Sequence, residues 1–175
     1  QEGAQAAVEQ ALNALECALQ EGVPGDETGW QALMTGAFAA AAEAVGRLAK
    51  AAGMPARAFA TTLACAAYGG GWLAAGQIGD GAIVAQDEAG SLLLAVRPQR
   101  GEYANEAYFL TMPDALNYLV VYAAEYPARG LAFTSDGLLR LAFKLPAYEP
   151  APQFFNPLLA FVASTAQPEQ AAAEL

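Results

Sequence analysis

The fold of this chain is decided by residues 59–96, which run FATTLACAAYGGGWLAAGQIGDGAIVAQDEAGSLLLAV. Short apolar runs of strand length alternate there with glycine-rich breaks, a pattern typical of consecutive antiparallel strands joined by tight turns. The expected strands are residues 59–68, 72–78, 82–86 and 91–96, and the breaks between them are residues 69–71, 79–81 and 88–90. The stretch therefore predicts an antiparallel meander.

Two helices are predicted before this stretch, because apolar residues recur there at helical spacing. The first ends at the turn residues 22–26, and the second runs from about residue 27 to residue 52, where Gly53 and Pro55 stop it. The buried stripes are expected to be Val8, Leu12, Leu15 and Leu19 on the first helix and Leu33, Ala37, Ala41, Ala44 and Leu48 on the second. Small residues allow close packing, so both helices should lie against another layer.

Further strands and then helices are predicted after residue 96. The expected strands are residues 107–110, 118–124 and 131–134; the expected helices are residues 138–143 and 157–163, joined by a proline-rich loop at 146–152. Helix formers continue from Pro168 to the last residue. Helices, then consecutive strands, then helices indicate an α+β fold in which helices cover sheet faces.

Composition and charge exclude several classes of protein. The chain of 175 residues has room for one domain with a core, and 55% hydrophobic against 15% charged residues argues against intrinsic disorder. The net charge of −10 would repel phosphate backbones, so no nucleic-acid partner is expected. No stretch is apolar enough to span a bilayer, and no leader precedes the first helix, so we expect a cytoplasmic domain without a membrane partner.

Histidine and cysteine usage restrict the chemistry further. The chain has no histidine, which removes Ser-His-Asp and Cys-His triads and imidazole metal sites together. Its two cysteines, Cys17 and Cys65, have small apolar neighbours, so buried thiols are favoured over a disulfide or a reactive nucleophile. This usage is consistent with a reducing compartment.

The glycine triplet Gly69–Gly71 has two interpretations. A phosphate-binding loop would need a Gly-Lys-Ser/Thr ending and a following helix, and the triplet has neither. Tyr68 and Trp72 flank it within strand-like runs, so a hairpin turn is favoured.

Two Asp-Gly pairs, Asp80-Gly81 and Asp136-Gly137, place a carboxylate where an apolar strand meets a turn. Either pair could be an ordinary hairpin turn, since Asp-Gly is a common turn sequence. The second pair is followed by a helical pattern rather than a return strand, and a carboxylate at such a corner suits a hard cation such as Mg²⁺ or Mn²⁺. The two aspartates are far apart in sequence, so only the fold can bring them together.

Four motifs resemble, in order and approximate spacing, those of the metal-dependent (PPM-type, type 2C) protein phosphatases, and most of all a bacterial branch of that family. They are Ala60-Thr61-Thr62-Leu63, Ile78-Gly79-Asp80-Gly81, Gly101-Glu102-Tyr103-Ala104-Asn105-Glu106 and Thr134-Ser135-Asp136-Gly137-Leu138. The resemblance covers residues 59–141 directly, and the helices on both sides agree with the family layout. That layout is a four-layer α-β-β-α sandwich of two antiparallel sheets flanked by helices.

The resemblance implies hydrolysis of phosphoserine or phosphothreonine by water activated between two Mg²⁺ or Mn²⁺ ions. By the same analogy Asp136 is the catalytic residue and a metal ligand. Asp80 corresponds to a residue that holds a third, weaker metal in some members, while Thr61 and Thr62 belong to a packing motif. The implied partners are a phosphorylated protein substrate and a cognate kinase, in a bacterial signalling pathway.

The chain also departs from the family pattern. Family members carry an Asp-Gly pair on an early strand and a late aspartate on a closing strand, whereas no aspartate follows Asp136 here and Ala107 replaces the usual Thr. We therefore expect residues 1–175 to be a single phosphatase-like domain that lacks the first strands and the closing strand, and that is weakly active or inactive as it stands. Two alternatives stay open: a degenerate phosphatase-fold scaffold without catalysis, and an acidic protein related to the family only in topology.

Overall fold

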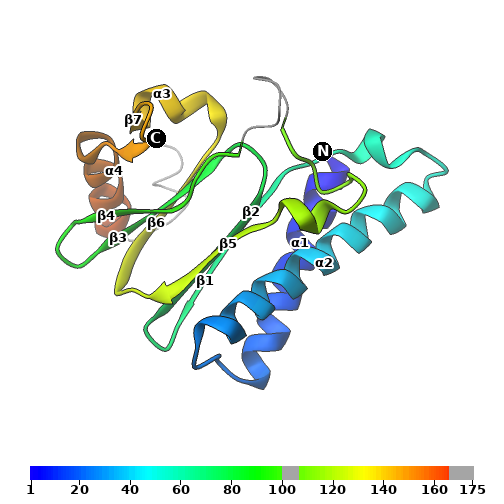
Figure 1. Cartoon of the computed structure of the whole chain (residues 1–175), viewed down its shortest axis with the longest axis horizontal. Helices are drawn as coiled ribbons and strands as arrows, with labels where there is room; N and C mark the ends of the chain where they lie inside the picture. Colours follow the sequence, from blue (N-terminus) through cyan, green and yellow to red (C-terminus); the bar gives the residue numbers. More distant parts are fainter. Residues whose placement is uncertain (100–106, 166–175) are drawn as a thin grey trace.

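The computed structural model describes residues 1–99 and 107–165, and its elements stack in four layers (Figure 1). The first layer is the helix pair α1 (Glu2–Glu21) and α2 (Glu27–Ala51). Behind it lie two three-stranded antiparallel sheets. The first sheet has the order β1-β2-β5, built from β1 (Leu63–Gly69), β2 (Trp72–Ile78) and β5 (Val120–Glu125). The second has the order β4-β3-β6, built from β4 (Leu92–Val96), β3 (Ala82–Asp87) and β6 (Ala128–Thr134).

The fourth layer follows β6 and covers the outer face of the second sheet. It contains α3 (Leu139–Ala142), the small ladder of β7 (Phe143–Lys144) with β8 (Glu149–Pro150), and α4 (Pro152–Ser164). Short 3-10 turns η1 (Ala56–Phe59), η2 (Ala115–Tyr118) and η3 (Asp136–Leu138) lie between the main elements. The predicted α+β sandwich of two antiparallel sheets flanked by helices is confirmed.

Three apolar clusters fill the spaces between these layers. The largest lies between α1, α2 and the first sheet and includes Trp30, Met34, Phe38 and Ile78. A second cluster, with Leu73 and Ile83, lies between the two sheets. The third packs Phe143 and Phe155 against the outer face of the second sheet. Every layer thus buries one face against the next, as an α+β sandwich requires.

The buried faces of the two helices differ from the predicted stripes. On α1 the buried residues are Gly3, Ala7, Ala11 and Leu15, whereas Val8 and Leu12 are 46% and 48% exposed. On α2 Ala37 and Ala41 are buried as predicted, but Trp30, Met34, Phe38 and Val45 complete the face, and Leu33, Ala44 and Leu48 are only partly buried. Leu15 is buried as predicted and Leu19 packs partly buried against the same cluster, so the error lies in Val8 and Leu12. Small residues, Ala7 and Ala11, occupy the interface in that half of the helix and let α1 approach its neighbours closely.

The glycine triplet forms the hairpin turn between β1 and β2, as favoured from the sequence. Gly69 and Trp72 are the last residue pair of the ladder, and Gly70 and Gly71 between them have φ of +57° and +82°. Positive φ at both central residues is the requirement of a type I′ turn, whose twist matches that of the flanking strands.

The predicted meander is wrong, because the chain changes sheets between β2 and β3. Residues 79–81 therefore form a crossover corner, while the β1–β2 and β3–β4 hairpins belong to different sheets. The strand predicted at residues 107–110 is also absent from the structure. Leu110 donates its N–H to the Thr61 carbonyl oxygen (2.8 Å), but this segment continues into turns and η2 rather than a ladder.

Several other boundaries differ from the predictions. The strand predicted to start at residue 59 starts only at Leu63 as β1, because Phe59 is the last residue of η1. The last helix starts at Pro152 rather than Pro157, because Pro152 occupies the first turn and Phe155 is buried against Phe143. The motif at 101–106 and the predicted helix after Pro168 lie outside the described residues. Among the described helices, none has both the length and the apolar character needed to cross a membrane.

Candidate functional site

The corner that joins β2 to β3 is the tripeptide Gly79-Asp80-Gly81, and its backbone leaves no space for side chains at the two glycines. A Cβ on Gly79, which has φ of +144°, would lie 2.7 Å from the Thr62 Cβ. A Cβ on Gly81 would lie 2.5 Å from the Thr134 carbonyl oxygen. Glycine is therefore needed at both positions, because atoms of Thr62 and Thr134 lie so close to them. Asp80 stands between these two tightly packed glycines.

The second aspartate corner lies beside the first at one end of the second sheet. Ala82, at the start of β3, pairs with Thr134, at the end of β6. Asp80 precedes this pair by two residues and Asp136 follows it by two, so the antiparallel register places the two corners opposite each other. Asp136 begins η3 directly after β6, at a strand-to-helix corner as the sequence indicated.

A cleft of about 270 Å³ opens at these corners. Its lining is Thr62, Leu63, Ala64, Gln77, Gly79, Asp80, Gly81, Phe133, Thr134 and Ser135. Asp80 is partly buried and lines the cleft directly. Asp136 is exposed and follows the lining residue Ser135. The cleft thus combines carboxylate, hydroxyl and amide groups contributed by both sheets.

Two glutamines hold the Gly79-Asp80-Gly81 corner. The Gln77 Nε2 donates to the carbonyl oxygens of Gly79 (3.0 Å) and Gly81 (2.8 Å). The Gln99 Oε1 accepts the Gly79 N–H (2.9 Å), and the Gln99 Nε2 donates to the Tyr118 carbonyl oxygen (2.5 Å). Sequence reasoning missed both residues. The available signal was Gln77 itself, a single polar side chain within the apolar run that leads into Gly-Asp-Gly.

The oxygen donors of the cleft suit a hard divalent cation, but they are few. In residues 1–99 and 107–165 no three His, Cys, Asp or Glu side chains gather closely enough to hold a metal ion. A two-metal centre needs more carboxylates than Asp80 and Asp136 supply. These residues on their own therefore do not fit the two-metal centre that the resemblance implies.

A larger cavity, of about 570 Å³, lies elsewhere, between α2 and residues 110–117. Its acidic lining residues are Glu43, which pairs with Arg47 (3.4 Å), and Asp114. Neither residue belongs to one of the four phosphatase motifs, so the smaller cleft at Asp80 is the better candidate for an active site.

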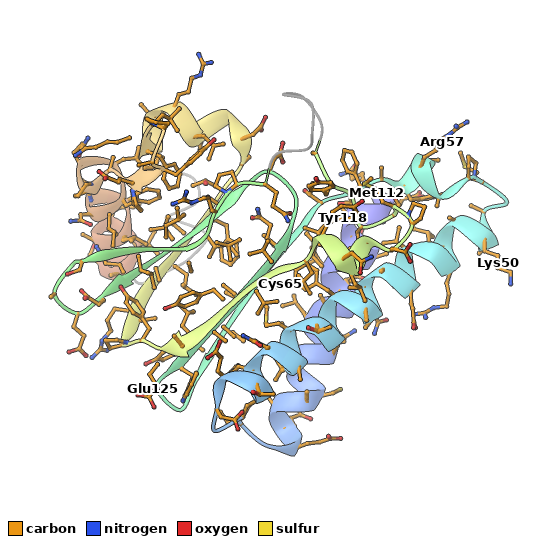
Figure 2. All side chains as sticks on the ribbon, viewed as in Figure 1. Lys50, Arg57, Cys65, Met112, Tyr118 and Glu125 are labelled. Carbon is orange, nitrogen blue, oxygen red and sulfur yellow. The ribbon has the colours of Figure 1, made fainter. Side chains whose placement is uncertain are left out.

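The two cysteines are both free, and their environments differ. Cys65 on β1 is buried among the side chains between the first sheet and the helices (Figure 2). This burial raises the pKa of the Cys65 thiol to about 11, so the thiolate needed of a nucleophile is disfavoured. Cys17 on α1 is exposed, and the expectation that both thiols are buried is wrong for this residue.

The comparison with known proteins agrees with this arrangement. Residues 1–175 match the family model described as Protein phosphatase 2C, and the chain belongs to that family. The resemblance predicted from the four motifs is confirmed. The chain is also similar to Serine/threonine-protein phosphatase 3 of Escherichia coli (strain K12), with 36% identity over 91 residues. That match covers 52% of this chain, which spans only 36% of the length of the relative.

Proposed function

We propose that this chain contributes to a protein serine/threonine phosphatase that hydrolyses phosphomonoesters. The observation that supports the proposal is a cleft lined by Asp80, with Asp136 directly after its lining residue Ser135, in a chain of the Protein phosphatase 2C family. Its similarity to an E. coli protein named as a serine/threonine-protein phosphatase supports it. Its substrate would be a phosphorylated protein, and a cognate kinase in a bacterial signalling pathway would be the opposing partner, in the cytoplasm.

The proposed cofactors are two Mg²⁺ or Mn²⁺ ions, with a third, weaker site. Asp136 and Asp80 would supply carboxylate oxygens, Asp136 to the catalytic centre and Asp80 to the weaker site. A divalent ion bound there would neutralise negative charge on the phosphoryl group and favour deprotonation of the attacking water. The remaining ligands would come from outside the described residues, and the domain bounded at 1–175 would then be a partial one.

The first test is hydrolysis of p-nitrophenyl phosphate with added Mn²⁺, by this chain and by the product of its complete gene. We expect weak or no turnover by residues 1–175 and clear turnover by a product that carries further carboxylates. Chelation with EDTA should abolish that turnover, and added Mn²⁺ should restore it. Equally high rates from the chain alone would show that the ligand assignment is wrong.

Substitutions in the active form test the two aspartates. D136N should lower kcat/KM by at least about 100-fold. Removing a residue that only supports a metal ligand typically costs about 10- to 100-fold in activity, and removing the ligand itself should cost more. D80N should cost less, about tenfold. Asp87 is the matched control: it ends β3 far from the cleft and its carboxylate accepts the Ser91 N–H (2.8 Å). D87N should therefore leave the rate within about twofold.

A phosphatase-fold scaffold without catalysis is the second candidate. The small number of carboxylates at the cleft in the described part of the chain favours it. Binding of a phosphopeptide by the complete gene product, with no release of phosphate at any Mn²⁺ concentration, would support the scaffold over the enzyme.

A further inference from the structure

Gln77 is placed where it can control the geometry of Asp80. It lies near the end of β2, is 1% exposed and donates through one amide group to the carbonyls of Gly79 and Gly81. Asp80 is the residue between those two carbonyls. A side-chain amide has two N–H donors, so both donors of Gln77 are used in holding the peptide groups on either side of Asp80.

The same two bonds fix the direction of the Gln77 carbonyl oxygen. With the amide reversed, Oε1 would face two carbonyl oxygens and neither contact could be a hydrogen bond. Oε1 must therefore face away from these two carbonyl oxygens. It would lie 3.4 Å from a Cβ on Gly81, and Gln77 lines the cleft.

This oxygen is buried and has no hydrogen-bond partner among the described residues. A buried acceptor left unpaired is unfavourable, so native proteins pair such atoms with protein groups or with ordered water. The unpaired oxygen is therefore a cost of placing an amide here, and the two hydrogen bonds to the carbonyls of Gly79 and Gly81 are what the amide supplies in return.

Gln99 supports the corner from the opposite direction. Its side chain accepts the Gly79 N–H, and its own N–H donates to the Gly79 carbonyl oxygen (3.3 Å). The Gly79 carbonyl therefore accepts from both glutamines. Its peptide group is fixed more firmly than an ordinary loop peptide, which is what a site needs to hold a carboxylate in one place.

We propose that Gln77 is a positioning residue for Asp80, clamping the peptide groups on both sides of it. Its value for catalysis rests on the proposed phosphatase function, whereas the clamp itself does not. The test can therefore be made on residues 1–175 without any measurement of activity.

The first measurement is hydrogen exchange of the Gln77 side-chain NH₂ by NMR in the unmutated chain. Both protons donate to backbone carbonyls in a buried place, so they should exchange at least about tenfold more slowly than those of the exposed Gln20. Equal exchange rates at Gln77 and Gln20 would overturn the clamp.

The second measurement compares two variants with a control. Q77M keeps the length of the side chain without its hydrogen bonds, and Q77E faces the two carbonyls with oxygens. Each should shift the Asp80 carboxyl ¹³C resonance and raise the exchange rate of the Gly79 amide by about tenfold. Gln86 is the matched control, since it lies on β3 and donates to the Asn156 Oδ1 (2.9 Å).

Q86M should leave both Asp80 and Gly79 unchanged while lowering overall stability. A folded Q77M with an unshifted Asp80 resonance would overturn the proposal. If Q77M fails to fold, the exchange rates of Gln77 and Gln20 in the unmutated chain still decide whether the clamp exists. None of these outcomes depends on turnover, so the proposal can fail while the phosphatase function stands, or stand while that function fails.

Discussion

At the scale of single residues, the lack of space for a Cβ atom restricts both residue 79 and residue 81 of the corner to glycine. The sequence motifs directed attention to Asp80, which lines the cleft, and to Asp136, which follows the lining residue Ser135; their roles as metal ligands stay predictions. The motifs did not indicate Gln77. The hydrogen-bond partners of Gln77 are backbone carbonyls of residues 79 and 81, which turn towards it only because the chain leaves the first sheet there.

Replacing Gly81 by alanine tests the packing of this corner. The new methyl group would lie 2.5 Å from the Thr134 carbonyl oxygen, a backbone atom that cannot move without shifting β6. We expect G81A to lower the free energy of unfolding by about 1–3 kcal/mol, measured by urea denaturation.

Gly36 on α2 is the control for this variant. A Cβ there meets no atom within 4 Å, and alanine favours helix over glycine. G36A should therefore raise the free energy of unfolding by about 0.5–1 kcal/mol. A G81A protein as stable as the parent would show that the corner is looser than described.

At the scale of elements, size and spacing of apolar residues predicted that the helices exist but not which face they bury. The predicted stripe of α1 is right at Leu15 but wrong at Val8 and Leu12, where the small residues Ala7 and Ala11 form the buried face. The strand predicted at 107–110 failed for a related reason. Its aromatic and apolar residues suit a strand, but Leu110 is buried by the helix layer and bonds only to the Thr61 carbonyl at its edge. Propensity is overridden wherever tertiary packing supplies the contacts.

Two neighbouring residues of α1 test this correction. Ala11 is 0% exposed, so A11L should force larger atoms into the helix interface and cost about 1–3 kcal/mol of stability. Leu12 is 48% exposed, and L12A should change stability by less than about 0.5 kcal/mol. Thermal or urea unfolding of both variants measures the difference. A larger loss from L12A than from A11L would restore the predicted stripe.

At the scale of the whole molecule, the layer order was predictable because helices, strands and helices follow one another along the chain. The division of the strands between two sheets was not. It depends on the chain leaving the first sheet at residues 79–81, where the local sequence is that of a hairpin turn, and on the later crossings from β4 to β5 and from β5 to β6. The β4 strand lies against β2 and β5, so the two sheets share one apolar cluster. We expect the four layers to unfold together.

Substitution of Phe155 tests this cooperativity. Phe155 is 1% exposed and packs against Phe143 with ring centroids 5.4 Å apart, in the fourth layer. F155A should cost about 3–5 kcal/mol. Trp30 and Trp72 report on the first layer and first sheet, and their fluorescence should change at the same urea concentration as the circular dichroism of the whole chain.

The control on the same helix is V162A, since Val162 is 49% exposed and should tolerate the change. A tryptophan transition that stays at its original urea concentration in F155A, while the circular dichroism shifts, would show that the layers unfold separately.

The crossover has a mechanical consequence. Gly79 is the first residue after β2 and Gly81 the last before β3, so Asp80 is the middle residue of the three-residue link that connects these two strands. A small rotation of one sheet against the other would act on these three residues and on the connections from β4 to β5 and from β5 to β6. Because Gln77 and Gln99 brace the first of these links, the distortion should fall on the other two, and the Asp80 carboxylate should keep its place while the sheets move.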